Sequence, residues 1–249
     1  MRFQIKSYFS QKNVLSLILF QCFFTTIFSQ KVIQQNYRKF DEKLIHFGFM
    51  LGGNSTGFQV TPVSNAYEKY GIIALENVNQ PGGQLGMVTT LKLGTPLLRL
   101  RFIPTLSFQE RVLKYYYPPL KPEDKKEIFQ EERVNSTNLD FPLMLQFRTA
   151  RYNNFASYIV GGGQFTYDLQ STEKSNQSYT DPFVKIKAKD WQGQVGVGVE
   201  FFAVYFKMGL EIKYSQGFRN AVIKDLTPVS DPIDQLKNKV WWFSLILEG

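Results

Sequence analysis

Apolar and polar residues alternate in several stretches of this chain. In the clearest stretch, every second residue from Leu139 to Phe147 is a large apolar side chain, while the positions between and after them include Asp140 and Arg148. A period of two is typical of a β-strand whose two faces meet different surroundings. A second strand-like stretch at 155–169 follows after a few polar residues. Together the two stretches predict a β-hairpin.

The same pattern recurs along the rest of the chain and predicts eight strands in all. We expect them at 44–53, 83–93, 97–116, 139–148, 155–169, 191–202, 205–215 and 239–248. The connections between these strands are in turn long and short. Such an alternation is the signature of an all-β, eight-stranded antiparallel up-and-down transmembrane β-barrel, with long outer loops and short periplasmic turns. An even number of strands places both termini at the periplasmic end.

A soluble barrel is the alternative, and it would put apolar residues inside and polar residues outside. Here the uninterrupted face of large hydrophobic residues is opposed by a face that carries Arg, Lys, Glu and Gln. Lipid outside and polar side chains inside explain both faces. We therefore expect Phe102, Leu145 and Leu210 to face hydrocarbon near the middle of the membrane.

Aromatic residues make up 16% of the chain, and many fall at the predicted strand ends. Amphipathic rings concentrate at both interfaces of a bilayer, so these residues predict two aromatic girdles. The expected outer girdle is Tyr115, Tyr116, Tyr167, Trp191, Tyr214 and Trp241, and the expected inner girdle is Phe147, Tyr152, Phe155, Phe201 and Tyr205.

The N-terminal region has the composition of a targeting segment. Three basic residues precede a mostly apolar run at 14–28, which is too short for a membrane-spanning helix. We predict a cleaved signal peptide at 1–30, a polar periplasmic lead at 31–43 and the barrel at 44–249. The one cysteine, Cys22, would leave with the signal peptide, which excludes disulfides and thiol chemistry in the mature chain.

Candidate chemistry is sparse. His46 is the only histidine, and no serine has the context of a nucleophile elbow, so we interpret His46 as a structural residue of the lumen. Gly161, Gly162 and Gly163 lack the Gly-Lys-Ser/Thr continuation of a phosphate loop. We therefore predict no enzymatic activity, no metal and no cofactor. The net charge of +8 is spread along an exported chain, which argues against nucleic acid as a partner.

Charged residues on the lumen face form the candidate functional site. By the strand phase they are Arg99, Arg101, Arg148, Glu200, Lys207 and Glu211. In one interpretation they pair into an ionic core that fills a narrow barrel, because eight strands leave room only for side chains. In the other, surplus positive charge at the inner mouth binds an acidic element of a periplasmic partner.

Four blocks of the sequence resemble a known family. They are K-F-D-E-K-L-I-H-F-G-F-M-L-G-G-N from Lys39, R-F-I-P-T-L-S-F-Q-E-R from Arg101, R-Y-N-N-F with the following G-G-G-Q-F-T-Y-D-L, and G-V-G-V-E-F-F-A-V-Y-F-K from Gly196. Together they are similar to the PorT/SprT proteins of Bacteroidetes, from about Lys39 to the end of the chain.

The resemblance implies an outer-membrane protein of a Gram-negative bacterium that serves type IX protein secretion and, in gliding members, motility. It supplies no catalytic residue. The implied partners are outer-membrane lipid and other secretion proteins, with no small-molecule substrate. A generic barrel acting as an adhesin or anchor, and a lipid-modifying enzyme using His46, remain as alternatives.

Overall fold

The computed structural model describes residues 35–37, 40–119, 128–173 and 183–249. The predicted signal peptide at 1–30 and part of the predicted lead, 31–34 and 38–39, lie outside the described residues. Within these described residues there is one α-helix, the short α2 (Ala66–Tyr70). No helix in this described part is long and apolar enough to cross a membrane.

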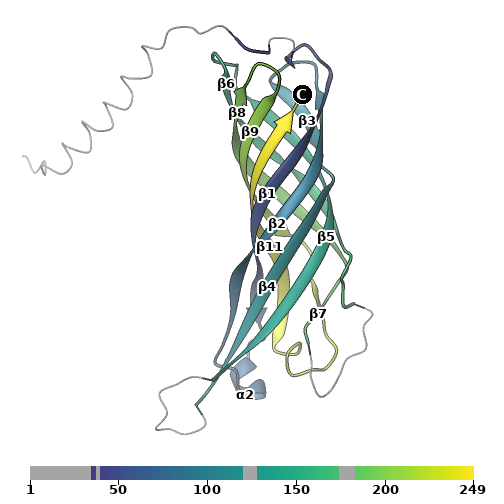
Figure 1. Ribbon diagram of the computed structural model, residues 1–249. Coiled ribbons are helices and arrows are strands. Elements are labelled where there is room, and N and C mark those ends of the chain that lie inside the picture. Colours follow the sequence, from purple (N-terminus) through teal and green to yellow (C-terminus); the bar gives the residue numbers. More distant parts are fainter. Residues whose placement is uncertain (1–34, 38–39, 120–127, 174–182) are drawn as a thin grey trace, which may run out of the picture. The chain divides into compact units, whose positions relative to one another are not determined.

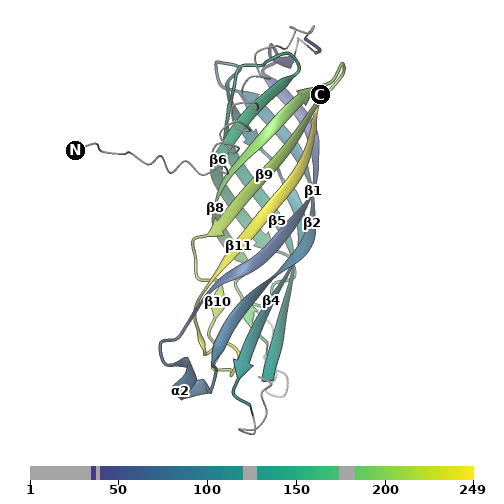
Figure 2. The same cartoon turned by 90° about the vertical axis from the view of Figure 1, so that its left-hand side faces the viewer.

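Most of the described strands form one antiparallel sheet that closes on itself, as Figures 1 and 2 show. Its nine strands are β1 (Ile45–Pro62), β2 (Ala74–Lys92), β3 (Leu98–Phe102), β4 (Thr105–Tyr117), β5 (Ile128–Arg148), β6 (Phe155–Asp168), β8 (Lys189–Phe202), β9 (Lys207–Gly217) and β11 (Ile233–Glu248). Closure comes from β1, which pairs with β2 on one side and with β11 on the other. A small second sheet pairs β7 (Lys185–Ile186) with β10 (Val222–Ile223).

Proline interrupts the strand that the sequence predicts at 97–116. Both β3 and β4 pair with β2 and with β5, so they follow one another between the same two neighbours. Between them lies Pro104, which has no N–H to donate to the sheet. Its carbonyl still accepts the N–H of Met87 at 3.0 Å. The alternation continues across the break, with Ile103 and Thr105 both facing inward and buried.

The predicted lipid-facing phase agrees with the observed exposure. Phe47 and Phe49 of β1 are 65% and 66% exposed, whereas Met50 beside them is 1% exposed. The three side chains expected at mid-membrane, Phe102, Leu145 and Leu210, also point outward and are exposed. The outer surface of the barrel is thus an apolar belt around a polar interior.

The strands run further than predicted at the end away from the termini. Much of the expected loop 54–81 belongs to β1 and β2, and β5 begins inside the expected loop 118–138. These predictions were wrong because the polarity of the two faces reverses there. Outside, Arg133 pairs with Glu110 at 3.0 Å and Lys114 pairs with Glu131 at 2.8 Å.

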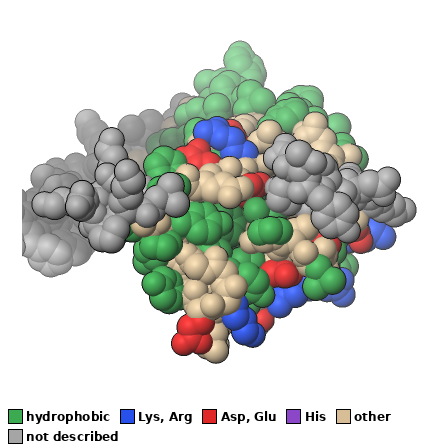
Figure 3. Space-filling view, turned by 90° about the horizontal axis from the view of Figure 1, so that it is seen from below, with side chains coloured by type: hydrophobic (Ala, Val, Ile, Leu, Met, Phe, Trp, Pro, Cys, Tyr) green, Lys and Arg blue, Asp and Glu red, His purple; other side chains and the backbone are tan. Residues whose placement is uncertain are grey.

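The interior of the same end is apolar. A buried cluster fills it, made of Phe58, Ile72, Leu113, Tyr115, Val134, Val184, Ile186, Val222, Val229, Ile233 and Leu236. Tyr115 was predicted in the outer girdle, but its side chain is fully buried and donates a hydrogen bond to the carbonyl of Val229 at 2.6 Å. Figure 3, which looks at this end, shows hydrophobic, basic and acidic side chains mixed across its surface.

Candidate functional site

All six lumen residues predicted from the sequence point into the barrel near the end that holds the C-terminus. Their relative exposures are at most a few per cent, and the four strands β3, β5, β8 and β9 contribute them. Alternation explains the burial: Arg99, Arg101 and Glu211, for example, each lie between two outward apolar neighbours on their strands. The structure therefore brings the predicted residues together in one cluster.

Arg101 lies at the centre of this cluster. Its Nη1 is 2.8 Å from Oε2 of Glu211, and its Nη2 is 2.8 Å from Oε1 of Gln146. The hydroxyl of Tyr158 donates to the same Glu211 oxygen at 2.9 Å. Since Lys213 also pairs with Glu211, at 3.0 Å, this carboxylate is held from three sides.

Glu200 forms ion pairs with two further cations of the cluster. Its carboxylate is 2.7 Å from Nζ of Lys207 and 3.4 Å from Nη1 of Arg148. Lys207 also contacts Glu248, and Thr90 donates to Glu248 at 2.6 Å. Sequence reasoning missed Glu248, although the period of two that places Ser244 inward on β11 also places Glu248 there.

The N-terminal lead supplies a further carboxylate. Asp41 accepts from Nη2 of Arg99 at 2.8 Å and from Nη2 of Arg148 at 2.7 Å. Sequence reasoning proposed that an acidic element of a partner could meet this positive charge. In the structure, an acidic side chain of the chain itself lies there.

The same lead closes the lumen mouth with an aromatic ring. Phe40 is 0% exposed and stacks on the imidazole of His46, with 3.8 Å between ring centroids. The guanidinium of Arg99 and the ammonium of Lys207 lie 5.0 Å and 4.8 Å from the centroid of the Phe40 ring. Cations over an aromatic face are attracted to it, so the ring fits the charged site beneath it.

Two hydrogen bonds of Asn36 connect the lead to the β5–β6 turn. Its backbone N–H donates to Oδ1 of Asn154 at 2.7 Å, and its carbonyl accepts from Arg151. We name Asn36, Phe40 and Asp41 the mouth latch. His46, expected in the lumen, lies directly under this latch, and neither of its ring nitrogens has a hydrogen-bond partner among the described residues.

A second polar layer lies deeper in the barrel. Asp140 accepts hydrogen bonds from Ser107 at 2.7 Å, from Thr166 at 2.7 Å and from Gln164 at 2.8 Å. A small apolar cluster also lines the interior, formed by Met50, Val88, Ile103 and Ile246. Side chains thus occupy the lumen from the mouth latch to the larger buried cluster around Tyr115 at the far end.

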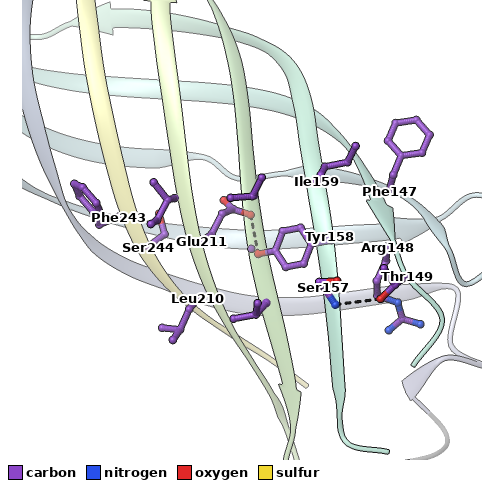
Figure 4. Close-up of a pocket in the computed structure, with 14 residues that line it drawn as sticks. Phe147, Arg148, Thr149, Ser157, Tyr158, Ile159, Leu210, Glu211, Phe243 and Ser244 are labelled. Atoms are coloured by element: carbon purple, nitrogen blue, oxygen red, sulfur yellow. Dashed lines mark hydrogen bonds between the residues drawn. The ribbon is translucent and has the colours of Figure 1, made fainter. Parts of the chain in front are cut away.

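A hollow lies in the membrane-facing wall of the barrel. It has a volume of about 920 Å³, and Figure 4 shows the side chains that line it. Its outward residues, among them Val197, Leu210 and Phe243, are apolar and exposed. Behind them the Tyr158–Glu211 hydrogen bond belongs to the lumen cluster. The hollow is a depression in the apolar belt, with an apolar lining suited to acyl chains.

The chemistry available in the lumen is that of paired charges. Among the described residues no group of His, Cys, Asp or Glu is arranged to hold a metal ion. Buried carboxylates and cations that neutralise one another support a packed interior.

Comparison with known proteins agrees with this architecture. The profile of a family described as outer membrane protein beta-barrel domain matches residues 28–222. The chain belongs to this family. It is therefore an outer-membrane β-barrel protein, and its apolar belt is the surface that meets lipid.

No protein with a curated description matches the chain. Among solved structures, the outer membrane protein OprG from Pseudomonas aeruginosa is similar at 13% identity, with a TM-score of 0.45, over 82% of this chain and 93% of that one.

Proposed function

We propose that this protein is a non-enzymatic accessory of type IX protein secretion that assembles or stabilises a separate translocon in the outer membrane. Two kinds of support meet here. The four sequence blocks resemble PorT/SprT proteins, and the closed lumen argues against a role as the conduit. The closed lumen is the observation that carries the proposal.

The proposal includes a definite arrangement in the membrane. Counting β3 and β4 as one crossing gives eight transmembrane strands, for which the interior is just wide enough for side chains. The longer connections, including α2, face the outside of the cell, and the termini face the periplasm. A folded cargo protein could not pass through such a lumen.

A barrel that conducts nothing acts through its surfaces. On this proposal, secretion partners contact the periplasmic mouth with its lead and the outer loops, while the belt contacts lipid. No nucleic acid, small-molecule substrate or cofactor takes part. The lumen cluster then serves as a rigid support that fixes the mouth latch in place.

A deletion strain tests the proposal. Loss of many secreted cargo proteins from the medium, restored by the wild-type gene, is the expected result. If surface adhesion alone were lost, the protein would act as an adhesin or anchor. If lipid A changed while secretion stayed normal, the enzyme alternative would hold. Either of the last two outcomes would overturn the secretion role.

A further inference from the structure

Basic side chains follow the aromatic girdle on one side of the barrel, at the end away from the termini. On β8, the outward residue two positions beyond Trp191 is Lys189, and on β11 the outward residue two positions beyond Trp241 is Lys239. Two residues of a strand span about 6.6 Å. Since such aromatic rings mark the membrane interface, the two ammonium groups lie at the level of the lipid headgroups.

Two more cations lie beside these lysines. Lys237 is the next outward residue on β11, and Arg219 follows the end of β9, which runs between β8 and β11. The Phe218 N–H donates to the Trp191 carbonyl at 2.9 Å, which fixes this segment next to β8. We name Lys189, Arg219, Lys237 and Lys239 the basic rim.

The basic rim forms no ion pair within the part of the chain that the structure describes. Among the described residues, none of its four side chains takes part in an ion pair, whereas the lumen cations and the β4–β5 surface are paired. Glu173 precedes this region, but its carboxylate accepts the backbone N–H of Ala188 at 2.8 Å and forms no ion pair with the basic rim among the described residues.

The opposite face of the same end differs in charge. There Lys114 and Arg133 are matched by Glu131 and Glu110, and Glu76 is exposed beside them on β2. Among the described residues of this end, surplus positive charge therefore lies on the β8–β9–β11 side, where the one acidic residue of β11 near the basic rim, Asp234, pairs with Lys224 at 3.9 Å. General solubility would not require such a segregation.

Hydrophobic anchors flank the basic rim from the membrane side. A side chain added at Gly193 would meet the ring of Phe218, so this ring lies across the outward face of β8. Phe218 is 66% exposed, and Trp241 packs against Tyr214 with 5.0 Å between ring centroids. Apolar rings below and cations above suit an amphiphile whose acyl chains and charged head lie in the same order.

We propose that the basic rim binds the phosphate groups of an anionic glycolipid in the leaflet that meets the outer loops. Lysine and arginine form charge-assisted hydrogen bonds with phosphate oxygens. Neighbouring strands lie about 4.8 Å apart, so β8 and β11, on either side of β9, are about 9.6 Å apart, and their long cationic side chains can approach the phosphates of one headgroup from two sides. Such a bound lipid fixes the rotational position of the barrel in the membrane and turns the β4–β5 face toward other partners.

The test uses the folded full-length barrel in non-ionic detergent micelles. Bisphosphorylated lipid A is added, and bound lipid is counted by native mass spectrometry. The same glycolipid without phosphates and inorganic phosphate as a competitor serve as comparisons. The double variant Lys189→Gln, Lys239→Gln is measured against the matched variant Lys114→Gln, Arg133→Gln, which removes two cations from the opposite face.

We expect the wild type to bind the phosphorylated lipid and the rim variant to bind it more weakly, by roughly fivefold for each cation removed. The control variant should bind like the wild type, and both variants should show the heat-dependent gel shift of a folded barrel. Equal binding of the phosphate-free lipid would overturn the proposal. Equal weakening in the control variant, or displacement by inorganic phosphate at the same concentration as the lipid, would overturn it as well.

Discussion

The ring of Phe40 lies parallel to the imidazole of His46, with 3.8 Å between their centroids and 17° between their planes. The two residues come from the lead and from the start of β1, and their stack closes the lumen of the barrel. Beneath it, Arg99 and Lys207 face the same ring. A segment that the sequence presents as a polar leader is thus part of the barrel's interior.

Replacing Phe40 by alanine should open the mouth and destabilise the protein. Loss of a fully buried phenylalanine costs about 3–5 kcal/mol. We expect this loss in the free energy of unfolding, measured with urea in lipid vesicles, together with faster proteolysis of the lead. Tyr205→Ala is the control at the same end, since Tyr205 is 84% exposed. Equal losses in the two variants would show that the latch does not support the fold.

Replacing Glu200 by glutamine should destabilise the barrel strongly. The change leaves Lys207 and Arg148 buried without one of their carboxylates. Removing one partner of a buried ion pair costs about 3–5 kcal/mol. The matched change Glu131→Gln on the outer surface should have a far smaller effect, because solvent screens that pair. Urea unfolding of both variants measures the difference, and an equally small loss for Glu200→Gln would contradict an ionic core.

The outer face of β5 offers a test of the lipid belt. Leu145 is exposed at the middle of the belt, whereas Leu169 lies just past the end of β6. Arginine at position 145 should cost about 2–4 kcal/mol on folding into a bilayer, and arginine at position 169 about 1 kcal/mol or less. Reversible folding into vesicles checks both values. A similar cost at the two positions would place the bilayer elsewhere on the barrel.

Much of the fold could be predicted from sequence because lipid imposes a regular pattern. Between the girdles every second side chain must be apolar, so the phase of β5, β8 and β9 follows directly from their residues. Beyond the girdles water meets the outside and the pattern reverses. Glu131 and Arg133 point outward there while Val134 points inward. The sequence of such a strand has the same charged pattern as a loop.

The candidate site likewise has a part that the sequence predicts and a part that it does not. The six predicted lumen residues lie on regular strands, so alternation alone places them inside. Asp41 lies on the lead, where no periodicity fixes its direction, and its contacts with Arg99 and Arg148 depend on how the lead folds back. Tyr115 shows the converse: an aromatic residue at a strand end suggests a girdle, but the reversed polarity turns it into the interior.

The orientation in the membrane can be tested with single cysteines. Glu68→Cys, in α2, should react with a membrane-impermeant maleimide on intact cells. Thr95→Cys, in the turn between β2 and β3, should react only after the outer membrane is permeabilised. Both native side chains are exposed, so accessibility to water is matched. The reverse labelling pattern would show that the termini face the outside of the cell.

The central claim is that this barrel is closed by its own side chains and does not serve as the conduit. Single-channel recording of the purified protein in planar lipid bilayers tests it most directly. A lumen filled by the Arg101 cluster and covered by Phe40 predicts no sustained conductance above that of the bilayer alone. A stable conductance of large-pore size in the wild-type protein would contradict the account.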